Sequence, residues 1–170
     1  MKSKKLVYTA LFIALGIIFP SIFHLSGLSG KIFLPMHIPV ILGGMILGPI
    51  SGMIIGILTP ILSSILTGMP PAFPMLPIMI AELLVYGLVS GYISYILGLN
   101  NYVSLVISMI LGRLSAGFVA FILSNLFNLD MGFINYIKGA IITGFPGIIL
   151  QIILIPLIVK LISKKARIDA

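Results

Sequence analysis

The sequence predicts an all-α membrane protein, a compact bundle of six transmembrane helices with both termini in the cytoplasm. Hydrophobic residues make up 60% of the 170 residues, and charged residues only 8%. A soluble domain carries about 25% charged residues, so this chain has too few charges to cover a surface that faces water. Its mean hydropathy is +1.30. The length suits a single domain, residues 1–170, embedded in the lipid bilayer.

Positive charge is concentrated at the two ends of the chain. Basic residues that flank membrane spans favour the cytoplasmic side, so both termini are predicted to be cytoplasmic and the number of spans to be even. The net charge of +7 does not indicate nucleic-acid binding, because no basic face with interleaved aromatic residues is present. Seven of the ten basic residues lie at the ends: Lys2, Lys4, Lys5, Lys160, Lys164, Lys165 and Arg167.

Three spans are predicted in the first half of the chain. The first covers residues 6–23, and no signal-peptidase motif follows it, so we expect it to remain uncleaved. Residues 32–66 contain no charge and are numerous enough for two short helices. A break is expected at 48–52, because Pro49 lacks an N–H group and the flanking glycines permit a turn. The second span therefore ends near Leu47, and the third covers 52–66.

Three further spans are predicted after a proline-rich loop. Four prolines between residues 70 and 77 exclude a regular helix there. The fourth, fifth and sixth spans cover 76–97, 102–126 and 134–162, and the sixth is expected to break near 144–147. With cytoplasmic termini, the loops near 24–36, 67–75 and 127–133 face outward. These loops are longer and more polar than the other turns, which predicts a pocket open to the outside.

An ion pair is expected between the fourth and fifth spans. Glu82 and Arg113 lie within spans that are joined by a short turn. Ionisable groups at such depth usually face the protein interior or a water-filled cavity. Two roles remain open for the pair, because it can hold two helices together or contact a substrate.

Other polar and small residues are weaker candidates. His37, near the outer start of the second span, is either an interfacial cap or a pocket wall, and Asn125 is either a solvated helix end or a pocket group. Gln151 is expected to hydrogen-bond between helices. Small residues four positions apart let helices approach closely. They occur at Ala10/Ala14, Gly44/Gly48, Gly52/Gly56 and Gly87/Gly91.

Enzymatic activity, a metal and a cofactor are not expected. The chain has no cysteine and no G-x-S-x-G motif. It has no glycine-rich phosphate loop with a lysine, so it does not hydrolyse ATP by itself. Paired carboxylates are missing, and neither histidine has an acidic residue near it in sequence.

Several segments together resemble the S components of energy-coupling factor (ECF) vitamin transporters, which are small six-helix membrane proteins without an ATPase motif. The resemblance spans nearly the whole chain. It is clearest in the segment LPMHIPV at 34–40, in TPILSSILTGMPP at 59–71, in Ala81-Glu82 with Tyr86-Gly87, and in Ala10-x-x-x-Ala14.

The resemblance implies a high-affinity substrate-binding subunit of an ABC-type importer in the plasma membrane. Members of that family bind a vitamin or vitamin precursor in an outward pocket, dock on a transmembrane coupling protein with two ATPase subunits, and topple to release the substrate. It implies a lid at residues 69–73 and a docking face at Ala10 and Ala14. The substrate-binding residues implied are His37, Met69, Pro70, Pro71, Phe73, Glu82, Arg113 and Asn125.

The sequence leaves the substrate open. Arg113 suits a carboxylate such as that of pantothenate, unless Glu82 already neutralises it; cobalamin, folate, riboflavin and other micronutrients are alternatives. The main alternative class is a stand-alone ion-coupled secondary transporter, which often shows internal repeats, and no convincing repeat relates 1–85 to 86–170. A membrane scaffold needs no pocket, and the polar, proline-rich loops argue against it.

Overall fold

The structure is a computed structural model that describes residues 3–25, 30–129 and 131–163. Lys2, Asp130, Lys164, Lys165 and Arg167 lie outside the described residues, so most of the charge pattern that orients the termini is not placed. The cytoplasmic position of the termini stays a prediction.

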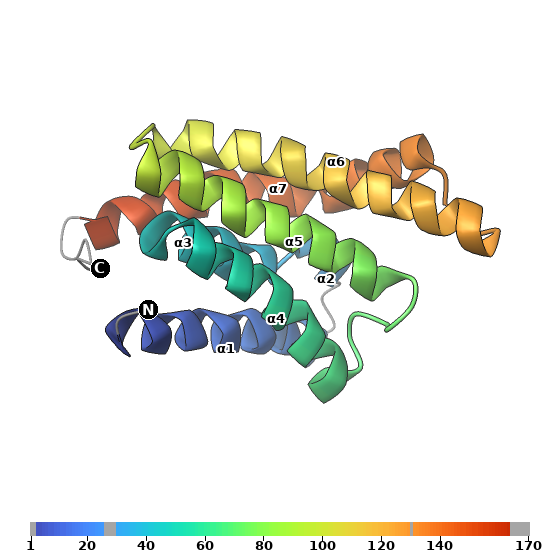
Figure 1. Ribbon diagram of the computed structural model, residues 1–170, viewed down its shortest axis with the longest axis horizontal. Helices are drawn as coiled ribbons and strands as arrows, with labels where there is room; N and C mark the ends of the chain where they lie inside the picture. The colour runs from blue at the N-terminus through green and yellow to red at the C-terminus, as the bar shows by residue number, and fades with distance from the viewer. Residues whose placement is uncertain (1–2, 26–29, 130, 164–170) are drawn as a thin grey trace.

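The described chain is helical except for short connections (Figure 1). Within the described residues, α1, α4, α6, α7 and the continuous pair α5–η1 are long and apolar enough to cross a membrane, which confirms the predicted all-α membrane fold. The elements are α1 (Ser3–Leu25), α2 (Gly30–Phe33), α3 (His37–Leu47), α4 (Pro49–Thr67), α5 (Met75–Gly91), the π-helical turn η1 (Tyr92–Ile96), α6 (Asn101–Phe127) and α7 (Phe133–Ser163).

The predicted second span is divided into two helices. The short helix α2 is followed by a turn, in which the His37 amide donates to the carbonyl of Leu34 at 3.1 Å, and α3 then runs for only 11 residues. Almost every residue of α3 is buried by protein. A helix enclosed by its neighbours need not match the bilayer thickness, and irregular backbone is tolerated at membrane depth where protein covers it.

The break expected in the last helix is absent, and that prediction was wrong. α7 continues from Phe133 to Ser163 through Pro146 and Pro156. Prolines are tolerated in membrane helices because neighbouring groups compensate for the lost hydrogen bond. The glycine at 147 serves packing instead, since a Cβ there would lie 2.7 Å from the carbonyl oxygen of Ile32 in α2.

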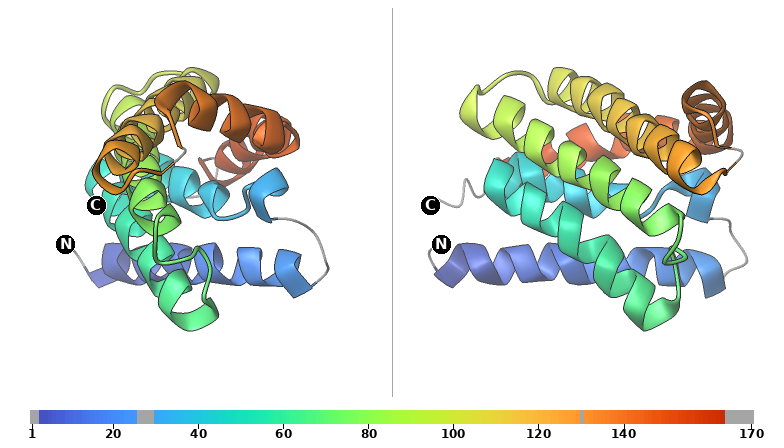
Figure 2. Two further views of the ribbon diagram at one scale, coloured as in Figure 1. Left: turned by 90° about the vertical axis from the view of Figure 1, so that its right-hand side faces the viewer. Right: turned by 45° about the vertical axis from the view of Figure 1, so that its right-hand side comes forward.

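The helices alternate in direction, so the connections gather at two ends of the bundle (Figures 1 and 2). α1 begins and α7 ends at one end, together with the α3–α4 and η1–α6 turns. The start of α3 and the α4–α5 and α6–α7 connections lie at the opposite end, here called the loop end. α5 packs against α3, α4 and α6, while α1 lies at the edge of the bundle against α3 and α4.

Glycines bring α3, α4 and α5 into backbone contact, as their spacing predicted. A Cβ on Gly87 of α5 would overlap the backbone of Gly52 in α4, and one on Gly56 would overlap the backbone at Leu83. A Cβ on Gly44 of α3 would overlap the carbonyl oxygen of Gly87. This close packing fixes α5, which carries Glu82, relative to α3, which carries His37.

Gln151 does not form the interhelical hydrogen bond that was expected of it. It is buried in α7, and neither amide atom has a hydrogen-bond partner among the described residues. Ile155, one turn further along the same helix, belongs to the main hydrophobic core.

Candidate functional site

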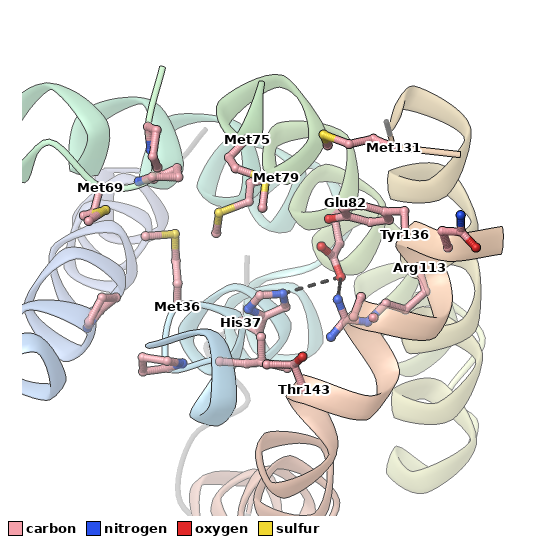
Figure 3. A pocket seen from close by; sticks show the side chains of 18 residues that line it. Met36, His37, Met69, Met75, Met79, Glu82, Arg113, Met131, Tyr136 and Thr143 are labelled. Carbon is pink, nitrogen blue, oxygen red and sulfur yellow. Dashed lines mark ion pairs between the residues drawn. The ribbon is translucent and has the colours of Figure 1, made fainter. Parts of the chain in front are cut away.

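A cavity of about 500 Å³ lies at the loop end of the bundle (Figure 3). Its walls come from the end of α1, the segment that leads into α3, the α4–α5 loop, α5, α6 and the first half of α7. Every long helix except α4 therefore contributes side chains, and α4 contributes through the loop that follows it. Sites that take a drug-sized ligand have volumes of about 300–1,000 Å³, so the cavity is large enough for a small metabolite.

One cluster of ionisable side chains lies in the cavity wall. The predicted ion pair is present: Nη1 of Arg113 lies 2.7 Å from Oε1 of Glu82. Nε2 of His37 lies 3.5 Å from the same oxygen. Figure 3 shows Glu82 pointing between His37 and Arg113. Three helices thus meet at one carboxylate oxygen, α3 through His37, α5 through Glu82 and α6 through Arg113.

Tyr86 supports the cluster from the protein interior. Its hydroxyl donates to Oε1 of Glu82 at 3.0 Å, one helical turn away on α5. Its ring is fully buried and packs beside His37, with ring centroids 5.3 Å apart. Gly112, next to Arg113, makes room for this ring, since a Cβ there would overlap it. Tyr86 therefore fixes the carboxylate of Glu82 without reaching the cavity.

The cluster leaves polar atoms without partners. Nδ1 of His37 and Nη2 of Arg113 are buried and have no hydrogen-bond partner among the described residues, and Nε2 of His37 has only its contact of 3.5 Å with Glu82. His37 is only 3% exposed, and its ring lines the cavity. A buried polar group without a partner costs about 1–3 kcal/mol, and a ligand in the cavity can supply the missing partners.

Methionines form much of the remaining wall. The chain has nine methionines, and five of them line the cavity from four segments (Figure 3). The thioether side chain is flexible and polarisable, and it makes favourable contacts with aromatic rings. The five are Met36, Met69, Met75, Met79 and Met131.

Helical periodicity explains how α5 builds this wall. Met75, Met79, Glu82 and Tyr86 recur at intervals of four, three and four residues, so they lie on one face of the helix. That face turns towards the cavity and the bundle interior. The α4–α5 loop above it is held by two serines of α4, because Ser63 donates to the carbonyl of Met69 and Ser64 to that of Pro70, each at 2.7 Å.

The structure gathers most, but not all, of the residues that the sequence selected. Six of the eight predicted substrate-binding residues line the cavity: His37, Met69, Pro70, Pro71, Glu82 and Arg113. Phe73 lies outside it, half exposed, with its ring 4.9 Å from that of Phe127. Asn125 is exposed and donates to the carbonyl of Phe121 in its own helix at 2.9 Å.

Sequence reasoning missed the contribution of α7. Asn135, Tyr136, Gly139, Ala140 and Thr143 line the cavity. Their spacing puts them on one face of the helix, and the two small residues leave space in front of them. A periodic polar face that includes Asn135, Tyr136 and Thr143 is the signal that could have identified them.

The predicted docking residues lie far along α1 from the cavity. Ala10 and Ala14 are exposed in this chain, as are Leu6, Val7 and Ile18 around them. Only 17% of an apolar 18-residue stretch of α1 is buried within the bundle. This face of α1 is therefore open to lipid or to another protein.

Comparison with known proteins gives one match. The family model described as "ECF transporter, substrate-specific component" matches residues 4–159. No curated protein and no solved structure matches the chain significantly. The family match covers nearly the whole chain, including all residues of the ion cluster and the cavity wall.

Proposed function

The chain belongs to the family of ECF transporter substrate-specific components, and from that premise we propose that it binds a vitamin or vitamin precursor with high affinity in the cavity at the loop end. Members of this family are transport subunits and not enzymes. The proposal concerns the class of ligand, the residues that hold it and the partners that energise its transport.

The observation that supports this proposal best is the ion cluster in the cavity wall. Nδ1 of His37 and Nη2 of Arg113 are buried and have no protein partner among the described residues, while the carboxylate of Glu82 is held by Arg113 and Tyr86. A purely structural ion pair gains nothing from adjacent unsatisfied donors. We therefore assign His37, Glu82 and Arg113 to substrate binding, with Met69, Pro70 and Pro71 in the loop above them.

Phe73 and Asn125 take different roles in this proposal. Phe73 anchors the α4–α5 loop on α6 through Phe127, so it affects the ligand through the loop. Asn125 lies on the exposed side of α6, and we no longer assign it a contact with substrate.

The size and polarity of the cavity bear on which vitamin is bound. A volume of about 500 Å³ favours a small vitamin over cobalamin, whose corrin macrocycle is far larger than a drug-sized ligand. An unpaired Arg113 would favour the carboxylate of pantothenate, but Arg113 is paired with Glu82 at 2.7 Å. Pantothenate is therefore no longer favoured over other small vitamins.

The proposed partners are a transmembrane coupling protein and two ATPase subunits in the plasma membrane. The chain has no phosphate-binding loop of its own, so ATP hydrolysis must come from other subunits. We propose that the exposed face of α1 around Ala10 and Ala14 docks on the coupling protein.

Calorimetric titration of the purified chain without partners tests the proposal. The panel consists of pantothenate, cobalamin, riboflavin, folate, pyridoxine and thiamine precursors, without ATP or an ion gradient. We expect one compound to bind tightly at one site per chain. Binding that requires a sodium or proton gradient would instead favour a stand-alone secondary transporter, and no binding by demonstrably folded protein would contradict the proposed ligand class.

A further inference from the structure

The charges that line the cavity compensate one another. Among the described lining residues, the charged side chains besides His37 are Glu82 and Arg113, and they form an ion pair at 2.7 Å. The opposite charges of these two side chains cancel. Among the described lining residues, Glu82 and Arg113 are therefore already paired with each other when a charged ligand group enters the cavity.

An ionised ligand would therefore lose its hydration without gaining an opposite charge. Burying an ionised group without a partner is far more costly than burying a polar group that forms hydrogen bonds. Competition for Arg113 would not solve the problem, because removing Arg113 from Glu82 would leave the buried carboxylate without its cation. Glu82 is 2% exposed, so water would not replace that cation.

The unsatisfied atoms indicate which polar group is missing. Nη2 of Arg113 can only donate a hydrogen bond. Nδ1 of His37 and Nη2 of Arg113 have no hydrogen-bond partner among the described residues. A carbonyl, ring nitrogen or hydroxyl of a neutral ligand would satisfy the guanidinium donor.

Apart from Asn135, Tyr136 and Thr143 on α7, the rest of the wall is apolar and fits an apolar or aromatic body. Five methionines approach the cavity from different segments, and thioether sulfur contacts the edges of aromatic rings favourably. On this basis we infer that the substrate is an uncharged molecule, with a hydrogen-bond acceptor that faces His37 and Arg113 and a flat apolar or aromatic ring that packs against the methionines. This inference rests on the proposed function and narrows its ligand class.

The test compares neutral and anionic molecules with the same skeleton. Purified wild-type protein is titrated with nicotinamide and nicotinate, pantothenol and pantothenate, riboflavin and riboflavin 5′-phosphate, and biotinamide and biotin. For the skeleton that binds, we expect the neutral member to bind at least tenfold more tightly. An anionic member that binds as tightly or more tightly would overturn the inference and leave the proposed function intact.

A charge-removing variant tests the physical cause. Glu82→Gln keeps the shape of the side chain and leaves Arg113 as an unpaired cation. The affinity for the anionic member should therefore rise at least tenfold relative to the affinity for the neutral member. Asn125→Ala, on the exposed side of α6, should leave the preference unchanged. A preference that is the same in Glu82→Gln and wild type would refute the role of the ion pair. If no member of any pair binds to folded wild-type protein, the proposed function is contradicted and the inference falls with it.

Discussion

At the residue scale, the ion cluster bears on the two roles that the sequence left open for Glu82 and Arg113. The two side chains do pair, but the pair lies in a cavity wall with unsatisfied neighbours. Holding helices together and contacting substrate are therefore compatible roles, and they can be separated by measuring stability and affinity in the same variants.

Removing one partner of the pair should damage both properties. Glu82→Ala leaves the guanidinium of Arg113 buried without its anion, which costs about 3–5 kcal/mol. We expect a lower Tm in detergent and no measurable substrate binding. The double variant Glu82→Met/Arg113→Met removes both charges and should recover most of the Tm, because an apolar pair replaces a buried ion pair at little cost.

The double variant distinguishes the two roles. If it regains both Tm and affinity, the pair is structural and does not contact the substrate. Asn125→Ala serves as the control, and it should match the wild type in both measurements because its side chain contacts only a carbonyl of its own helix.

His37 should affect affinity without supporting the fold. Nδ1 of His37 makes no hydrogen bond with the described residues, and Nε2 has only the long contact of 3.5 Å with Glu82. His37→Phe therefore removes one weak contact and one unsatisfied nitrogen, and it keeps a ring beside Tyr86. We expect the Tm to stay equal or rise, while the affinity falls at least tenfold. A large loss of Tm with unchanged affinity would show that the imidazole serves the fold instead.

The sequence identified the cluster only in part, for a physical reason. Depth within two neighbouring helices was enough to pair Glu82 with Arg113, because a short turn fixes their register. His37 reaches the same carboxylate from a helix 45 positions earlier in the chain, and only the packing of α3 against α5 brings it there. Tyr86, by contrast, follows Glu82 by four residues, and helical spacing alone predicts that contact.

At the element scale, close packing between α4 and α5 should be the most sensitive part of the bundle. A Cβ at Gly87 would overlap the backbone of Gly52, and backbone cannot move aside as a side chain can. Overpacking costs about 1–3 kcal/mol or more, so Gly87→Ala should lower the Tm by several degrees. Gly132→Ala is the matched control, since a Cβ there meets no atom within 4 Å; equal Tm values in the two variants would contradict the described packing.

The boundaries of the elements were predictable where local chemistry decides them. Gly48 ends α3 as expected, with a φ of 92°, but α4 begins at Pro49, three residues before the predicted start at 52. The division of the second span into α2 and α3 was not predicted, because it depends on burial by surrounding helices. The continuity of α7 through Pro146 was missed for a related reason, since a proline rule for isolated helices ignores compensation by neighbours.

At the scale of the whole molecule, the bundle separates the cavity from the termini. The cavity lies at the loop end, and α1 begins and α7 ends at the other (Figure 1). α1 lies at the edge of the bundle and exposes an apolar face along much of its length. A partner can therefore bind this face without covering the cavity.

Bulky residues on α1 should uncouple transport from binding. In Ala10→Leu/Ala14→Leu, larger side chains would hold a docked helix away, so we expect loss of substrate uptake in cells that supply the coupling protein and ATPases. Affinity and Tm of the purified chain should be unchanged, because both alanines are exposed. Val106→Phe, on an exposed position of α6, controls for added bulk at the lipid surface; loss of binding together with uptake in the α1 variant would count against docking.

The central claim, that the cavity at the loop end is the substrate site, is tested most directly by blocking it. Thr143 lines the cavity with an exposed side chain, so Thr143→Trp should fill the space while leaving the Tm within about 2 °C of wild type, as expected for a surface substitution. Calorimetric titration with the vitamin that binds wild-type protein should give one site per chain in the wild type and no heat of binding in the variant. Equal affinity in both proteins would show that the substrate binds elsewhere.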